Sequence, residues 1–274
     1  MSKIWGSLFA LFILGSLQAQ LVNIEAIRMQ TDSTRLVLNA DFLFNYSNAD
    51  GIYIYQFGLG LNTQYKTKNY KNTFFFSGYA DLIRSQDQDF QNGWFIHFRY
   101  NRKLGESEKL RLEAFIQDQS NALLSINSRN LIGLGLRLKL IEKDVVWAYL
   151  GNSYMYEKEV SDVAGQTYYN HRNSTYLSLT LKLPESELEL VNTIYFQPLY
   201  TDISNFRVLE QFKIEMPLKG NLRVSTLFNY FYNNINPFGT SEFTSSLSVG
   251  LTYALEKKLT PAEYNPYLDL YTLP

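Results

Sequence analysis

Apolar and polar side chains alternate along most of this chain with a period of two residues. In residues 131–140, LIGLGLRLKL, every even-numbered position is isoleucine or leucine, whereas the odd-numbered positions from 133 onward are glycine, arginine or lysine. Successive side chains of a β-strand point to opposite faces. The pattern therefore predicts a strand with one apolar face and one face that is small or charged.

The same two-faced design recurs along the chain and predicts twelve strands. The predicted strands cover residues 35–46, 56–66, 74–84, 94–104, 110–117, 131–140, 147–157, 176–183, 188–199, 206–216, 222–232 and 245–255. Most of them have about 10 to 12 residues, which is longer than the usual strand of a soluble protein and suits a tilted crossing of a bilayer.

The connections between these segments alternate in length. Short polar sequences with turn-forming residues, such as PESE and PLKG, join every second pair of strands. Longer stretches join the others, at residues 85–93, 118–127, 159–173 and 233–243. An even number of strands with short turns at one end and long loops at the other is typical of bacterial outer-membrane barrels.

Alternation by itself also suits a soluble sandwich or a lipocalin-like cup, in which the apolar faces cover one another. The inward-facing sets are heavily polar, which a soluble core would not tolerate, and this favours the membrane alternative. Within a barrel Arg99 fixes the register, because a slip of one residue would place it in lipid, where it costs about 2–4 kcal/mol. The 21 Tyr and 19 Phe residues also suit interfacial belts near the strand ends. The sequence therefore predicts an all-β fold, a transmembrane antiparallel up-and-down β-barrel of about 12 strands over residues 34–256.

The two ends of the chain lie outside the strand series. Residues 1–19 have the order of a secretory signal peptide, with Lys3 before an apolar run and Ala19 at the expected cleavage position. We expect residues 20–33 to form a periplasmic lead-in segment and residues 257–274 a periplasmic tail. The absence of cysteine excludes a lipid anchor and disulfides. These features predict export to the bacterial outer membrane through a cleaved signal peptide.

Charge and residue types argue against several functions. Basic and acidic residues number 25 and 26 without long runs of either sign, which gives no support for nucleic-acid binding. A hydrolase needs a serine within reach of a base such as histidine. His97 is predicted to face the lumen and His171 to lie in the longest loop, so we expect no catalytic residue. We also expect no metal site and no cofactor, and we interpret Asp87, Asp89 and Asp162 as solvated loop carboxylates.

The inward-facing positions carry most of the charge. By parity, the lumen-lining residues are Arg35, Asp41, Lys66, Asp81, His97, Arg99, Arg111, Glu113, Arg137, Lys182, Arg207, Lys213 and Arg223. Every inward charge together, which adds Lys103, Lys139, Glu157, Glu189 and Glu215, gives eleven basic and six acidic residues. This excess of five would bias an open pore toward anions. The alternative is that these groups pair across a narrow, filled barrel that conducts nothing.

A few positions do not follow the simple pattern. Asn152, Asn192 and Glu210 have outward parity, and local β-bulges or an error of register would account for them. Gly133 and Gly135 lie inside a strand with no following helix. We therefore interpret these glycines as positions of close packing or sheet bending rather than as a phosphate-binding loop.

The central part of the chain contains the segments NGWFIHFRYNRKL, LRLEAFIQDQSN, LIGLGLRLKL and AYLGNSYMYEKE. Their characteristic residues are Glu113, Phe115, Arg129, Gly133, Gly135, Arg137, Gly151, Tyr156 and Glu157. This block, roughly residues 93–160, resembles the salt-induced outer-membrane protein family of Gram-negative bacteria, a family of unknown function. The resemblance implies an outer-membrane barrel and brings no substrate and no catalytic residue.

These features together predict an outer-membrane barrel that is either a small-solute channel with a weak preference for anions or a barrel related to envelope stress. A non-conducting structural or adhesive barrel is an alternative, and a lipid-modifying enzyme is a less favoured one. The expected partners are outer-membrane lipids and small anionic solutes. We expect a monomer or a weak oligomer.

Overall fold

The computed structural model describes residues 34–49, 52–85, 88–106, 109–121, 126–161, 166–235 and 243–258. The predicted signal peptide at residues 1–19 and the lead-in segment at residues 20–33 lie outside these residues, as does the predicted tail from residue 259 onward. Among the described residues, no helix is long and apolar enough to span a bilayer.

The described chain forms twelve β-strands, and each of the predicted strands falls in one of them. They are β1 (Thr34–Ala49), β2 (Ile52–Lys66), β3 (Asn72–Ser85), β4 (Gln88–Leu104), β5 (Leu110–Asn121), β6 (Ile126–Lys143), β7 (Val146–Ser161), β8 (Thr167–Leu183), β9 (Leu188–Pro198), β10 (Phe206–Lys219), β11 (Leu222–Asn233) and β12 (Phe243–Lys258).

Each strand pairs in antiparallel fashion with the next, and β1 pairs with β12 to close the barrel. The predicted up-and-down barrel of twelve strands is therefore confirmed. We call the end that holds Thr34 and Lys258 the turn end, because the connections predicted to be short lie there, and the opposite end the loop end.

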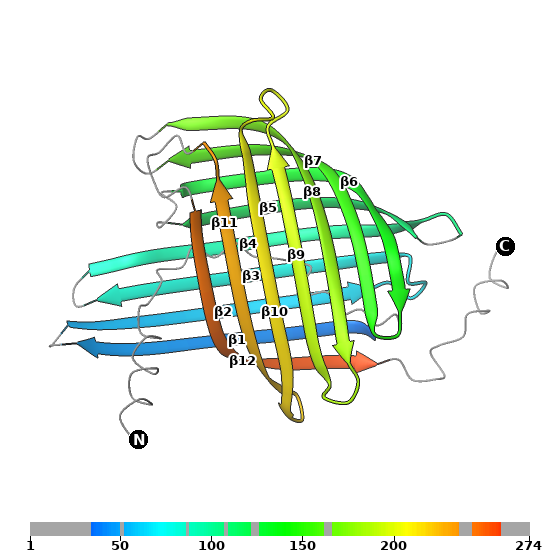
Figure 1. Ribbon diagram of the computed structural model, residues 1–274, viewed down its shortest axis with the longest axis horizontal. Helices are drawn as coiled ribbons and strands as arrows, with labels where there is room; N and C mark the ends of the chain where they lie inside the picture. The colour runs from blue at the N-terminus through cyan, green and yellow to red at the C-terminus, as the bar shows by residue number, and fades with distance from the viewer. Residues whose placement is uncertain are drawn as a thin grey trace, which may run out of the picture.

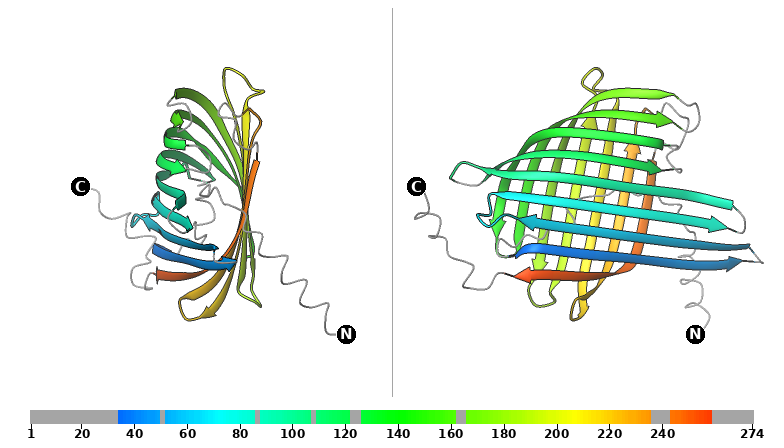
Figure 2. Two further views of the ribbon diagram at one scale, coloured as in Figure 1. Left: turned by 90° about the vertical axis from the view of Figure 1, so that its left-hand side faces the viewer. Right: turned by 180° about the vertical axis from the view of Figure 1, so that it is seen from behind.

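The barrel is flattened into two walls. Figure 1 shows the strands β1–β5 crossing behind β8–β11 at a steep angle, and Figure 2 shows the two walls edge-on, close together. β6 and β7 curve around one edge, and β12 bends around the other. Register shifts at Lys139/Ile141 in the β6–β7 pair and at Thr34/Leu36 in the β1–β12 pair lie near the ends of these strands.

The polarity of the barrel is inverted relative to a soluble protein. The outward residues Ile132, Leu134 and Leu136 are 56%, 56% and 46% exposed, whereas the inward residues Arg99 and Arg137 are 4% and 1% exposed. The apolar side of each strand thus faces outward and the polar side faces the interior. This confirms the register that was inferred from Arg99.

The predicted long loops are shorter than expected, because the strands extend into them. β7 continues to Ser161 and β8 begins at Thr167, so most of the stretch 159–173 is strand. The prediction that His171 lies in a loop is therefore wrong, since His171 lies on the outer face of β8. The alternating pattern fades here because both faces of these strand ends are polar, but the backbone pairing continues.

The bulges suggested for three outward polar residues do not occur. The β7–β8 and β9–β10 pairs run without a register shift at Asn152, Asn192 or Glu210. Instead, these side chains bond to neighbouring side chains on the outer surface. Asn152 Nδ2 donates to Thr175 Oγ1 at 2.7 Å, and Asn192 Nδ2 donates to Glu210 Oε1 at 3.1 Å.

Candidate functional site

The candidate site is the polar interior of the barrel. The structure buries eight of the residues named above as lumen-lining: Lys66, Asp81, His97, Arg99, Glu113, Arg137, Arg207 and Lys213. The others lie half-buried at inward positions of their strands: Arg35, Asp41, Arg111, Lys182 and Arg223. The interior divides into layers along the barrel axis, because successive inward positions of one strand lie two residues apart.

The layer nearest the loop end is an ionic group that we call the loop-side cluster. It consists of Glu157 and Glu159 on β7 together with Arg129 on β6, Arg172 on β8 and Arg207 on β10. Glu157 is fully buried, and its Oε2 lies 2.5 Å from Arg129 Nη2 and 2.8 Å from Arg207 Nη1. Three guanidinium groups and two carboxylates leave one net positive charge.

The loop-side cluster joins strands that are not neighbours. Arg129 and Glu159 are cross-strand partners in the β6–β7 pair, but Arg207 reaches Glu157 from β10, across the interior. Arg207 Nη2 also lies 3.2 Å from Glu159 Oε2. A buried charge is costly unless it is paired and hydrogen-bonded. These contacts therefore tie the two walls together.

An apolar layer follows directly beneath this cluster. Leu131 comes two residues after Arg129 and Met155 two residues before Glu157, and both pack against Phe115 of β5. A second apolar group consists of Ile126, Leu209, Phe231 and the partly buried Tyr195. Apolar side chains thus pack beside the loop-side cluster, with Phe115, Leu131 and Met155 on its turn-end side.

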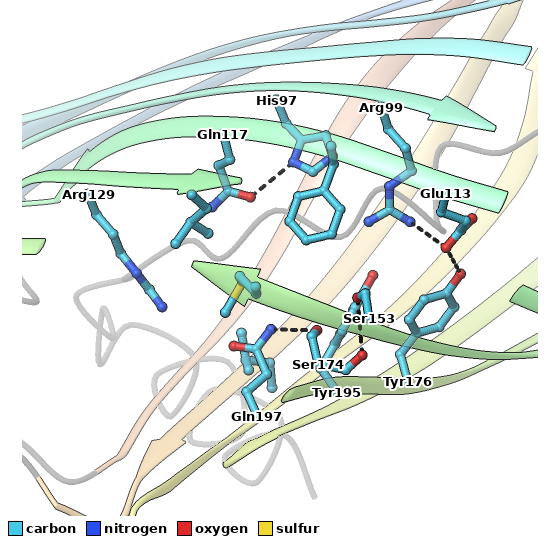
Figure 3. A pocket seen from close by; sticks show the side chains of 14 residues that line it. His97, Arg99, Glu113, Gln117, Arg129, Ser153, Ser174, Tyr176, Tyr195 and Gln197 are labelled. Atoms are coloured by element: carbon cyan, nitrogen blue, oxygen red, sulfur yellow. Dashed lines mark hydrogen bonds and ion pairs between the residues drawn. The ribbon is translucent and has the colours of Figure 1, made fainter. Parts of the chain in front are cut away.

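The next layer toward the turn end is centred on Glu113 of β5, and we call it the central cluster. Tyr176 of β8 donates to Glu113 Oε2 at 2.7 Å, and Arg99 Nη1 lies 3.7 Å from the same oxygen. Arg137 Nη1 lies 3.8 Å from Glu113 Oε1, with its guanidinium 3.7 Å from the centre of the Tyr149 ring. Figure 3 shows Glu113 between Arg99 and Tyr176, with a dashed line to each of them.

Two glycines make room for the rings of these layers. A Cβ at Gly133 would lie 2.1 Å from Phe115 Cζ, and a Cβ at Gly151 would lie 2.1 Å from Tyr176 Cε1. In both cases the ring belongs to the cross-strand partner of the glycine. The interpretation of Gly133 as a position of close packing is therefore confirmed.

A cavity of about 50 Å³ lies between the apolar layer and the central cluster. Figure 3 shows the polar side chains around it, among them Arg99, Arg129, Ser153, Ser174 and Gln197. Such a volume holds only a few water molecules, since one water needs about 10–15 Å³ on this measure. Side chains therefore leave little free space in the part of the interior that these residues line.

The predicted inward orientation of His97 agrees with its position between the rings of Phe95 and Phe115, at centroid distances of 6.0 and 5.6 Å. Its Nδ1 lies 3.0 Å from Gln117 Oε1. Ser77 is its cross-strand partner on β3, but the Ser77 hydroxyl donates to Asn62 Oδ1 at 2.6 Å. The hydroxyl proton thus points to the amide rather than to the imidazole.

Among the described residues, no group of three or more acidic or histidine side chains is placed to hold a metal ion. Asp87 and Asp162 lie outside these residues.

Inward basic residues gather near the turn end and form what we call the basic ring. It consists of Arg35, Lys66, Lys103, Arg111, Lys139, Lys182 and Arg223, one from each of seven strands. Some members of the ring pair with acidic side chains. Lys139 pairs with Glu142 at 2.5 Å, Lys182 with Glu189 at 3.0 Å and Arg223 with Glu215 at 3.8 Å.

A comparison with known protein families identifies the family of this chain. Residues 55–255 match the family described as "Protein of unknown function, DUF481". The chain belongs to this family. That description assigns no function, so the salt-induced name suggested by the sequence stays a prediction. The match includes the whole block 93–160 that carried the resemblance. A comparison with curated proteins gives no match.

Several solved structures resemble this DUF481 protein. An outer membrane channel from Pseudomonas putida F1 has a TM-score of 0.49 at 6% identity and covers 88% of this chain and 100% of its own. The NanC porin has a TM-score of 0.47 at 9% identity, with 80% and 98% covered, and the KdgM porin has a TM-score of 0.42 at 10% identity, with the same two shares.

Most residues that carried the sequence resemblance converge in the interior of this DUF481 protein. Phe115 packs on Gly133, Glu113 lies beside Arg137, and Arg129 binds Glu157. Tyr156 is the exception, because it lies on the outer face, 5.3 Å from the His171 ring. The residues that carry the resemblance therefore reflect the packing of β5, β6 and β7 inside the barrel.

Parity alone missed several charges of the interior. Among the residues that the structure describes, seven buried residues are basic, namely Lys66, Arg99, Arg129, Arg137, Arg172, Arg207 and Lys213. Six buried residues in the same part of the chain are acidic, namely Asp81, Glu113, Glu157, Glu159, Glu189 and Glu215. Arg172 and Glu159 were assigned to a loop, whereas Arg129 has the parity of Arg137 and was detectable. The excess of basic charge thus lies mainly in the half-buried basic ring.

Proposed function

We propose that this DUF481 protein is a bacterial outer-membrane barrel that serves as a narrow, anion-preferring channel for small solutes. Membrane placement is supported by the closed barrel with its apolar outer surface, because closure satisfies every backbone group that would otherwise meet hydrocarbon. The signal peptide predicted at residues 1–19 is consistent with export to that membrane.

The observation that carries the anion preference is the basic ring at the turn end. Rings of lysine and arginine side chains select anions at pore mouths. The ring opens toward a polar interior, and the loop-side cluster at the far end adds one further net positive charge. A solute that crosses the barrel would meet basic groups at both ends.

The close packing around the interior cavity favours a second function, a barrel that lends structure to the envelope without conducting. The supporting observation is the small cavity, together with the contacts of Tyr176 and Arg207 across the interior. The two functions differ in whether the apolar layer moves aside. Neither function assigns a catalytic residue, and a phospholipid-turnover assay on purified protein would reveal an enzyme.

Planar-bilayer recordings of the refolded protein test the channel proposal. We expect small current steps and, in a KCl gradient, a reversal potential of the sign given by chloride preference. Lys103→Glu combined with Arg111→Glu places two acids on neighbouring strands of the basic ring. We expect this variant to move the reversal potential toward cation preference.

The matched control carries the same charge change outside the ring, with Lys143→Glu and Lys219→Glu at exposed turn positions. We expect it to leave the reversal potential close to the original value. A barrel that is folded, inserted and silent in every recording would overturn the channel and favour the structural barrel. Equal shifts in both variants would overturn the role of the ring.

A further inference from the structure

A polar pair lies on the outer face of the barrel, on the wall formed by β8–β11. Asn192 of β9 donates from Nδ2 to Glu210 Oε1 of β10 at 3.1 Å. Their neighbours Thr193 and Gln211 are buried in the interior, so strand alternation directs Asn192 and Glu210 outward. We call them the outer polar pair.

Apolar and aromatic residues surround the outer polar pair. Its outward neighbours are Leu190 and Ile194 on β9, Val208 and Phe212 on β10, Leu177 and Leu179 on β8, and Phe228 and Tyr230 on β11. Both members lie within their strands, away from the ends at residues 188 and 198 of β9 and 206 and 219 of β10. The pair is therefore an isolated polar island in the part of the wall that would face hydrocarbon.

Lipid cannot satisfy this island. An acidic side chain within the hydrocarbon region is costly, and such residues usually face a protein partner or a water-filled space. Asn192 Oδ1 is buried within the protein, so the groups left for an outside partner are the second N–H of the Asn192 amide and the second oxygen of Glu210. Acyl chains offer neither a donor nor an acceptor, so a complement for the pair has to come from another polar group.

We propose that a second copy of this chain covers the outer polar pair and forms a twofold dimer through β9 and β10. The pair is self-complementary, since it presents an amide that donates and a carboxylate that accepts. A twofold axis beside it places Asn192 of one copy against Glu210 of the other, and the reverse. Figure 2 shows the wall that contains β9 and β10 edge-on as a thin, twisted layer. The inference rests on the membrane placement proposed above.

Single cysteines test this interface, because the chain contains no cysteine of its own. Ile194→Cys places a thiol beside Glu210, and Leu134→Cys places one on β6; the native side chains are 42% and 56% exposed. Each variant is reconstituted in phospholipid vesicles and treated with a short bis-maleimide. We expect Ile194→Cys to yield cross-linked dimer and Leu134→Cys to remain monomer.

A second substitution ties the cross-link to the polar pair. We expect Glu210→Leu in the Ile194→Cys background to lower the dimer yield about tenfold, because hydrogen bonds between membrane segments contribute on this scale. Glu210→Gln retains a hydrogen-bonding group and should retain most of the dimer. If Glu210→Leu does not fold, Asn192→Leu provides the same test.

Several results would overturn the dimer. In the vesicles, these results are equal cross-linking at the two cysteines, no dimer from Ile194→Cys, or a dimer yield that Glu210→Leu leaves unchanged. In native envelopes, the contradicting result is a cross-link to a different protein. Flotation of the vesicles distinguishes these results from a failure of membrane insertion, which would remove both proposals. Conductance is recorded separately, so a silent but dimeric barrel would overturn the channel alone.

Discussion

Single residues decide how the interior of this barrel is packed. Phe115 lies over Gly133 and Tyr176 lies over Gly151, in each case as cross-strand partners. Aromatic rings commonly cover glycines on neighbouring strands in this way. The sequence indicated that Gly133 is a position of close packing, but it did not name the ring, because the partner depends on strand register.

Gly133→Ala is expected to lower the free energy of unfolding by about 1–3 kcal/mol, because the added methyl group overpacks against the Phe115 ring. Urea unfolding from lipid vesicles, followed by tryptophan fluorescence, measures the change. Gly250→Ala is the control, since a Cβ there would meet only Phe42 O at an ordinary 3.6 Å. An equal loss in the two variants would contradict the packing role of Gly133.

Strands were predictable in number and face, but not in length. Alternation located all twelve because one face of each strand is apolar where it meets lipid. Near the loop end the outward positions are polar or aromatic instead, as at Lys158, Tyr169 and His171. The alternating signal is lost there although the backbone pairing of β7 and β8 continues. Strand ends were therefore mistaken for loops.

The cost of an outward arginine should follow its depth along a strand. Leu134→Arg, on the exposed outer face of β6, is expected to lower the free energy of unfolding by about 2–4 kcal/mol, because the charge meets hydrocarbon. Tyr169→Arg, near the loop end of β8, should cost only about 0–1 kcal/mol because it lies near the interface. Unfolding from vesicles measures both. Similar costs would show that the wall does not sit in lipid as proposed.

The closed topology of the whole molecule could be predicted from the even strand count and the alternation of short and long connections. The filling of its interior could not. Arg207 meets Glu157 from β10 to β7, and Tyr176 meets Glu113 from β8 to β5. Contacts between strands that are not neighbours depend on the shape of the cross-section, which parity does not describe. Pairing across the lumen was left open for this reason.

Glu157→Gln should both destabilise the barrel and widen its interior, because it leaves three buried arginines with less acidic charge and weakens the tie between β7 and β10. We expect a loss of about 3–5 kcal/mol, typical of breaking a buried ion pair, and larger current steps in bilayer recordings. Glu185→Gln changes an exposed carboxylate in the connection between β8 and β9 and should cost about 0–1 kcal/mol without a change in current. If Glu157→Gln lowers the stability but leaves the conductance unchanged, the contact between β7 and β10 does not control the width of the interior.

In a round barrel, the number of strands fixes both the perimeter of the cross-section and the area of the lumen. The flattened cross-section of this barrel separates the two. Twelve strands fix the perimeter through their backbone hydrogen bonds, but an ellipse encloses less area than a circle of the same perimeter. Rounding the section would therefore enlarge the lumen without breaking a single pair of strands. The resistance to that change lies in the side chains that bridge the short diameter.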